Sequence, residues 1–173
     1  MYWDATDPRQ CLSPDVLVWV GAPHTPVPLW KVWERGAPHV CVEVISKSDA
    51  RDRPWRRKLE RYRHCGVREL VRFDPEDLRA PLSIWDRVDE DLVQRSLDTP
   101  ESTSCDALGV YWCVRTDAVL GPMLRLAQDA AGSLLLPTLA EARLQAEAER
   151  RQAEARVREL EEKLAAVTRR DGG

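Results

Sequence analysis

Two carboxylates that stand in or beside apolar runs could together hold a divalent metal ion. Glu43 lies inside the run Val40–Ile45, where a charged side chain is costly unless a metal ion, an arginine or a proton compensates it. Asp15 directly precedes a second apolar run, Val16–Val20. If the two runs form neighbouring strands, the carboxylates can converge. Two carboxylates with a backbone carbonyl suit a hard, oxygen-seeking cation such as Mg²⁺ or Mn²⁺.

A lysine follows at helical spacing from a tyrosine. Lys58 lies on the helix that we expect after the Glu43 run, and Tyr62 stands four residues further on, one turn away on the same face. A lysine near a metal ion could orient an attacking water or stabilise negative charge that develops on a phosphate.

Each of these residues also has an ordinary structural interpretation. Glu43 could be a surface residue of an edge strand, or it could pair with one of the nearby arginines. Asp15 could be a turn residue, because Asp is common beside such turns. Lys58 could be one more surface lysine of a basic helix.

Charge is distributed unevenly along the chain. The net charge is −3, which argues against a general nucleic-acid binder. The segment 47–68, however, contains nine basic and three acidic residues. Such a basic segment can bind phosphates on an otherwise acidic protein. The predicted nucleic-acid-binding residues are Arg51, Arg53, Arg56, Arg57 and Arg61.

Several other kinds of site are excluded by the motifs that the sequence lacks. Its five cysteines form no CxxC pair, its three histidines form no HExxH pattern, and neither a serine elbow nor a glycine-rich phosphate loop occurs. The sequence contains no apolar run of membrane-spanning length, and its first residues do not resemble a signal peptide. We therefore expect a cytoplasmic protein with free, mostly buried thiols.

The order of apolar runs and breakers predicts an α/β chain of the α+β kind, with a helix packed on a mixed sheet. Residues 1–13 and the proline-rich segment 21–38 should be irregular. A helix should run from Pro54 to Cys65, with Gly66 as its C-terminal cap. The expected strands are Val16–Val20, Val40–Ile45, Val67–Phe73, Leu82–Trp85, Leu92–Leu97 and, as a possible last or edge strand, Leu108–Val114.

The composition changes near Leu139, where Ala, Glu, Arg and Leu begin to dominate. This predicts two parts, a domain over 1–137 and a helical tail over 138–173. Val157, Leu160, Leu164 and Val167 alternate by three and four, which is the spacing of a coiled-coil seam. The seam is strong over about two heptads only. A solvated amphipathic helix and a helix that self-associates, making a homo-oligomer, are both open.

A family resemblance rests on three segments: SPDVLVWV at 13–20, KVWERGAPHVCVEVIS at 31–46 and KLERYRHCGVRELVRFDPE at 58–76. In this order and spacing they resemble the Uma-two family of restriction-endonuclease-like proteins, in the PD-(D/E)xK nuclease superfamily. The matching positions are Pro14-Asp15, Trp33–Gly36, Glu43–Ser46, Lys58 with Tyr62, Gly66-Val67, Asp74-Pro75, Leu108-Gly109 and Leu124–Leu126.

The resemblance implies a restriction-endonuclease-like fold and Mg²⁺- or Mn²⁺-dependent hydrolysis of phosphodiester bonds. Asp15 and Glu43 would be the metal ligands, and both would be catalytic. The superfamily's usual lysine stands two residues after the glutamate, where this chain has Ile45. The lysine role then passes to Lys58, with Lys47 as the second choice.

Two departures from the family pattern bear on activity. Family members carry additional residues before the Pro-Asp strand, so we expect a restriction-endonuclease-like domain that is truncated at its N-terminus. The residues Arg53-Pro54-Trp55 also suggest a small insertion ahead of Lys58. Three functions follow: a metal-dependent endonuclease, with DNA as its expected substrate; an inactive descendant that binds nucleic acid or a partner protein; or a structural module that oligomerises through its tail.

Overall fold

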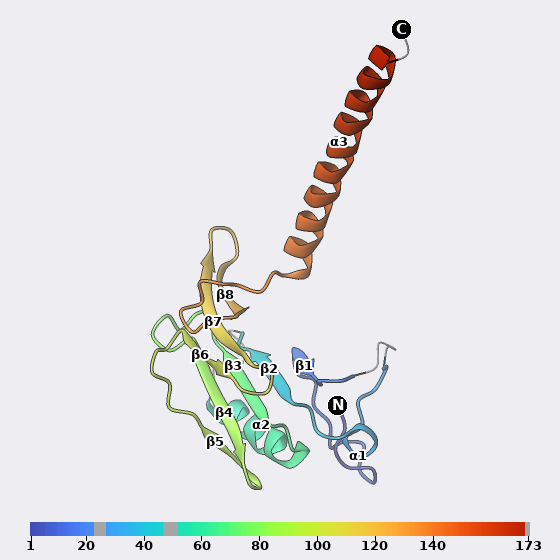
Figure 1. The fold of residues 1–173 in the computed structure, drawn as a ribbon. Coiled ribbons are helices and arrows are strands. Elements are labelled where there is room, and N and C mark those ends of the chain that lie inside the picture. Colours follow the sequence, from blue (N-terminus) through green and yellow to red (C-terminus); the bar gives the residue numbers. More distant parts are fainter. Residues whose placement is uncertain (23–26, 47–51, 172–173) are drawn as a thin grey trace. The chain divides into compact units, whose positions relative to one another are not determined.

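The structure is a computed structural model, and it describes residues 1–22, 27–46 and 52–171, without the side chains of 52–54 and 164–171. The chain divides into two compact units, residues 1–135 and 136–173 (Figure 1). The first unit is α+β and contains all the strands of the described residues. The second unit is a long helix that is preceded by a short connecting segment.

The larger sheet has five strands in the order β1-β2-β3-β4-β5. Strands β2 and β3 are parallel, and the helix α2 (Asp52–Cys65) connects them; the other three pairs are antiparallel. The mixed sheet expected from the sequence is therefore confirmed. The five strands are β1 (Val16–Val18), β2 (Val40–Val44), β3 (Glu69–Phe73), β4 (Leu82–Val88) and β5 (Asp91–Gln94).

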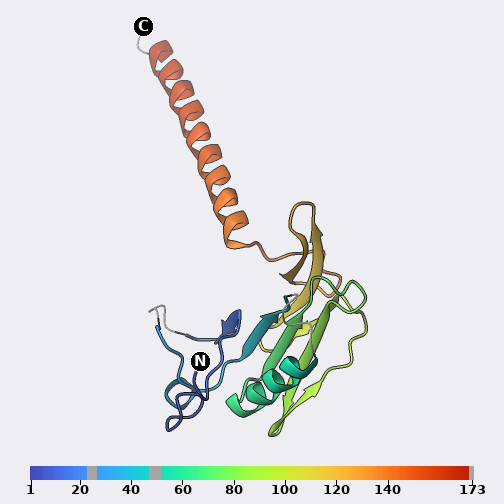
Figure 2. The same ribbon diagram turned by 180° about the vertical axis from the view of Figure 1, so that it is seen from behind.

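Helix α2 covers one face of this sheet, as the two opposite views in Figures 1 and 2 show. Tyr62 and Cys65 of the helix pack there against Cys41 and Leu70 of the central strands. Hydrophobic burial at this interface fixes the helix to the sheet. The glycine after the helix, Gly66, has a φ of +81°, which suits the predicted C-terminal cap.

A second sheet of three strands packs on the other face of the larger sheet. It consists of β6 (Ser102–Cys105), β7 (Val110–Asp117) and β8 (Gly121–Ala127), all antiparallel. Trp112 of β7 meets Val42, Val71 and Ile84 in the core between the two sheets. The expected strand at 108–114 is thus the middle strand of a sheet and not the last strand of the chain. Strand β8 begins with Gly121 and Pro122, two residue types that are depleted in strands, so its sequence gives only a weak signal for a strand.

Three local expectations were wrong. The strand expected over Val16–Val20 ends at Val18, and Val16 is 46% exposed, because β1 is the edge strand of its sheet. The segment expected to be irregular between residues 21 and 38 contains one turn of helix, α1 (Val32–Arg35). Helix α2 also begins at Asp52, two residues before the predicted start.

A buried ion-pair cluster joins the two sheets. Glu69 of β3 is 3% exposed, and it accepts hydrogen bonds from Nε1 of Trp112 at 2.7 Å and from Nη2 of Arg95 at 3.1 Å. Arg95 also binds both carboxylate oxygens of Asp86 and donates to the carbonyl of Ser104 in β6. Because every charge has an opposite partner, the carboxylate of Glu69 can be buried.

The second unit is α3 (Leu139–Asp171), where the sequence predicted a helix from 139 to 170. Thr138 and Glu141 form a capping box: the Thr138 hydroxyl accepts from the Glu141 N–H at 3.2 Å, and the Glu141 carboxylate accepts from the Thr138 N–H at 2.6 Å. Val157 and Leu160 of the predicted seam are about half exposed, at 52% and 50%. Among the described residues no helix combines the length and apolar character needed to span a bilayer.

Candidate active site

Glu43 is the centre of the candidate site. It lies in β2 between apolar neighbours and is only 2% exposed. Nζ of Lys58 donates to its Oε2 at 2.7 Å, and the hydroxyl of Tyr62 donates to its Oε1 at 2.5 Å. The surface interpretation of Glu43 is thereby wrong. Its charge is compensated by a lysine rather than by one of the nearby arginines.

Helix spacing explains why both partners come from α2. Lys58 and Tyr62 are four residues apart and therefore lie one above the other on the helix face that packs on the sheet. The pKa of Tyr62 is raised far above its usual range, first by burial and then by the hydrogen bond to Glu43. Tyr62 thus stays protonated and acts as a donor to the carboxylate.

Asp15 directly precedes β1, the edge strand that pairs with β2. Val16 of β1 is paired with Val42 of β2, so the antiparallel register places Asp15 one position further on, opposite Glu43. Oδ2 of Asp15 accepts a hydrogen bond from the N–H of Val44 at 2.7 Å. The structure therefore brings the two predicted acids to adjacent positions. Asp15 is exposed and Glu43 is buried.

The oxygen donors at this edge fit a hard divalent cation. In the described ranges 1–22, 27–46 and 52–171, no three His, Cys, Asp or Glu side chains gather as a metal-binding group. Mg²⁺ is commonly bound through only one or two carboxylates, with water and substrate phosphates completing its shell. Each carboxylate oxygen also has a second lone pair beside the bond it accepts. Asp15 and Glu43 are thus the residues that would hold the ion.

The position that carries a lysine in the superfamily pattern is occupied here by a buried apolar residue. Ile45 is 5% exposed, and its N–H donates to the carbonyl of Phe73 at 2.8 Å. The second candidate, Lys47, lies outside the described residues. Lys58 is the lysine whose ammonium group contacts Glu43.

An arginine that the sequence analysis missed lies beside Glu43. Arg72 of β3 is the register partner of Glu43 in the parallel pair, so their side chains share one face of the sheet. Its guanidinium lies 5.5 Å from the ring centroid of Trp55 of α2, and its Nη2 donates to Asp74 at 2.9 Å. The available signal in the sequence was a charged residue between apolar Val71 and Phe73 of a strand.

The predicted nucleic-acid-binding arginines are only partly described. Arg56 and Arg57 are exposed on α2. Arg61 lies 5.6 Å from the ring centroid of Trp3 and donates to the carbonyl of Arg9 at 3.3 Å, so it also helps to fix the N-terminal loop. Arg51 and the side chain of Arg53 lie outside the described residues.

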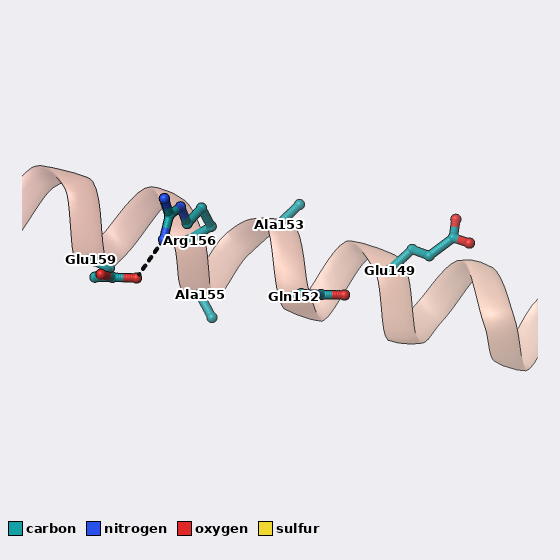
Figure 3. Close-up of a pocket in the computed structure, with 6 residues that line it drawn as sticks. All are labelled: Glu149, Gln152, Ala153, Ala155, Arg156 and Glu159. Carbon is teal, nitrogen blue, oxygen red and sulfur yellow. Dashed lines mark hydrogen bonds and ion pairs between the residues drawn. The ribbon is translucent and has the colours of Figure 1, made fainter.

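Two hollows on the described surface lie away from this carboxylate. One hollow of about 600 Å³, lined by Trp3, Arg61 and His64 among others, lies between the N-terminal loop and α2. Another follows α3, and Figure 3 shows that its lining residues, from Glu149 to Glu159, all belong to this single helix. Within that groove Nη1 of Arg156 pairs with Oε2 of Glu159 at 3.2 Å. A groove of one helix has too little wall to enclose a small ligand.

Comparison of the chain with protein-family models, curated proteins and solved structures gave no match. The candidate site consists of two carboxylates at adjacent positions, a lysine and a tyrosine bound to the buried carboxylate, and an arginine next to them.

Proposed function

We propose that the protein is a Mg²⁺- or Mn²⁺-dependent endonuclease with a restriction-endonuclease-like domain, and that DNA is its substrate. The observation that carries the proposal is the buried Glu43, which is bound by Lys58 at 2.7 Å and lies next to Asp15 across the β1–β2 edge. The resemblance to the Uma-two family and the strand–helix–strand unit of β2, α2 and β3 support it further.

The buried carboxylate of Glu43 is costly for stability alone, because removing a charge from water costs several kcal/mol per ion and apolar residues of the same size would often serve as well. Its partner Lys58 keeps 33% of its side chain exposed. Strongly paired ionisable groups of this kind are frequent at functional sites. Asp15 lies opposite the carboxylate-bearing residue of this pair, at the edge of the sheet, and is exposed to solvent.

Each residue has a distinct role in the proposed reaction. Asp15 and Glu43 would hold the divalent ion, which supplies Lewis-acid activation of the attacking water and neutralises charge on the phosphate. Lys58 compensates the charge of Glu43 and holds its carboxylate in place. Its ammonium group has three N–H donors and, among the described residues, gives one to Oε2 of Glu43, so the others would be able to reach a phosphate oxygen. Hydrolysis would join the water oxygen to phosphorus and break one ester bond.

The contacts of α2 explain how the geometry is kept before substrate arrives. Lys58 is 33% exposed at its side chain, so it can reach both the buried carboxylate and a bound substrate. Tyr62 is fully buried and fixes the other carboxylate oxygen. Arg56 and Arg57, exposed on the same helix, would attract the nucleic-acid backbone through charge. A cytoplasmic location belongs to the same proposal.

The decisive experiment is plasmid cleavage by the full chain with Mg²⁺ or Mn²⁺, against EDTA. We expect cleavage that requires the metal and falls at least about 100-fold in Glu43→Gln and in Lys58→Met. Glu34→Gln is the matched control, because Glu34 is exposed and, among the described residues, pairs with Lys31, which caps α1. A folded wild-type chain that cuts equally well in EDTA, or a Glu43→Gln chain that cuts normally, would contradict the proposal.

A second candidate is a nuclease-fold protein that binds nucleic acid, or a partner protein, without cutting. The specific observation in its favour is that both oxygens of Glu43 already have protein donors, Lys58 and Tyr62. Salt-sensitive DNA binding that is independent of metal, together with absence of cleavage, would favour this alternative.

A further inference from the structure

We propose that Arg72 is the side chain that binds the phosphate group of the substrate beside Glu43. This inference rests on the proposed function, because it names the residue that receives the anionic group at the same site. It concerns a position that neither the sequence motifs nor the nucleic-acid-binding segment included.

The strand register places Arg72 directly beside Glu43. Glu43 and Arg72 are direct partners in the parallel pair β2–β3, so their Cα atoms are about 5 Å apart and their side chains point to the same face. Both side chains contact the same helix: Glu43 contacts Lys58 and Tyr62, and Arg72 contacts Trp55. The arginine is therefore a direct neighbour of the carboxylate.

The guanidinium group is held in one orientation. On one side it stacks near Trp55, which itself packs against Trp85 with ring centroids 5.2 Å apart. On the other side Nη2 donates to Oδ2 of Asp74 at 2.9 Å. The second oxygen of Asp74 accepts the backbone N–H groups of Glu76 and Asp77, so this anchor belongs to a fixed turn. An arginine fixed in this way loses little conformational entropy when it binds an anion.

Among the described residues, most of the hydrogen-bond donors of Arg72 have no acceptor. A guanidinium has five N–H donors, and within the described part of the chain Arg72 gives one of them to Asp74. Its Nε is buried without a hydrogen-bond partner among the described residues, which costs free energy in the absence of a ligand. The side chain is nevertheless 23% exposed and so can be reached from solvent. Free donors in a planar fork are what a phosphate binds.

A positive side chain beside Glu43 would add to the attraction that a bound divalent ion exerts on a phosphodiester. A phosphodiester that approaches Asp15 and Glu43 meets two carboxylates, and among the described residues Lys58 pairs with Glu43. A second cation next to Glu43 lowers this repulsion. Arg72 supplies that charge from the sheet, on the strand next to the one that carries Glu43.

The test compares full-length wild type, Arg72→Met and Arg72→Lys, with Arg68→Met as matched control. Arg68 is an exposed arginine that precedes the same strand, at the end remote from Glu43. Affinity for a short fluorescent DNA duplex is measured over a range of salt concentrations with EDTA present. Mn²⁺ affinity without DNA and cleavage with Mg²⁺ are measured on the same samples, and thermal melting confirms folding.

We expect Arg72→Met to weaken DNA binding at least about fivefold and to reduce the salt slope by about one unit, as the loss of one phosphate contact does. Mn²⁺ affinity should change less than about twofold, because Arg72 is not a metal ligand, and cleavage should fall with the loss of binding. Arg72→Lys should recover only part of the affinity, since lysine cannot form the planar fork. Arg68→Met should bind as wild type.

The outcomes separate the two proposals. Unchanged DNA binding and cleavage in folded Arg72→Met, while Glu43→Gln is inactive, would overturn the role of Arg72 and leave the nuclease proposal intact. A wild-type chain that does not cleave but loses DNA affinity in Arg72→Met would support Arg72 and end the nuclease proposal. A wild-type chain that does not bind DNA would overturn both. If Arg72→Met does not fold, an Arg72→Lys chain with full affinity would overturn the inference.

Discussion

The hydroxyl of Tyr62 donates a 2.5 Å hydrogen bond to Oε1 of Glu43, and the two side chains are 0% and 2% exposed. They are nineteen positions apart in the sequence and meet because α2 packs back on the strand that precedes it. The buried hydroxyl of Tyr62 fixes one oxygen of the carboxylate, while Lys58, whose side chain is 33% exposed, binds the other oxygen. This relationship gives the first prediction.

Tyr62→Phe should destabilise the protein by about 1.5–3 kcal/mol, the usual contribution of a hydrogen bond to a charged group. Phenylalanine fills the same space, so the loss reports the bond and not a cavity. We also expect weaker Mn²⁺ binding, because the carboxylate of Glu43 is no longer fixed. Urea denaturation and calorimetric titration measure the two effects. Tyr111→Phe, on β7, is the control, and an equal effect there would show that the Tyr62 bond has no special role.

Arg95→Met should be strongly destabilising. It leaves Glu69, which is 3% exposed, and Asp86 without their shared cation, and breaking such a buried pair typically costs about 3–5 kcal/mol. The loss should appear as a lower urea midpoint, with Arg79→Met as an exposed control. A midpoint within the error of wild type would mean that the Glu69 cluster does not join the two sheets energetically.

Alkaline pH should destabilise the fold through its buried thiols and Tyr62. Burial raises the pKa of Cys65 to about 11 and that of Cys105 to about 12, and it raises the pKa of Cys41 further. Below the ordinary thiol value of 9.0 these groups are protonated in both states and contribute no pH dependence. Above it only the unfolded chain loses protons, so the free energy of unfolding falls by about 1 kcal/mol per pH unit and thiol.

This pH dependence can be measured by urea denaturation at neutral pH and at several values above 9.0, the ordinary thiol pKa. Cys65→Ala should show a shallower decline than wild type, although its stability at neutral pH is lower because of the cavity. A free energy of unfolding that is constant up to the raised pKa values would contradict the assignment of these thiols as buried and neutral.

The exposed apolar residues of α3 lead to a prediction about self-association. Val157 and Leu160 belong to the expected seam and are about half exposed, so we propose that two copies pair through them. In a parallel pair Arg156 of one helix would lie near Glu161 of the other. Light scattering of the full chain should show a concentration-dependent dimer that Val157→Glu with Leu160→Glu abolishes. Leu144→Glu, exposed but off the seam, is the control; a monomer at all concentrations would contradict the proposal.

The sequence by itself determined much of the local structure. Apolar runs predicted strands at 40–45 and 67–73, where β2 and β3 cover 40–44 and 69–73. Gly66 marked the end of α2, and the change of composition near Leu139 marked the start of α3. These features depend on neighbours in the chain: side-chain period, backbone freedom and helix propensity. The same reasoning placed Lys58 and Tyr62 on one helix face, because four residues make about one turn.

Only the tertiary structure decided which of these residues meet. That Lys58 rather than an arginine pairs with Glu43 depends on the packing of α2, and that Asp15 lies opposite Glu43 depends on strand register. The contacts of Arg72 with Trp55 and of Glu69 with Trp112 join elements that are separated in the sequence, as does the packing of Trp112 in one core with Val42. Such contacts form when surfaces are buried against one another in three dimensions. The local pattern of a sequence does not specify which surfaces meet.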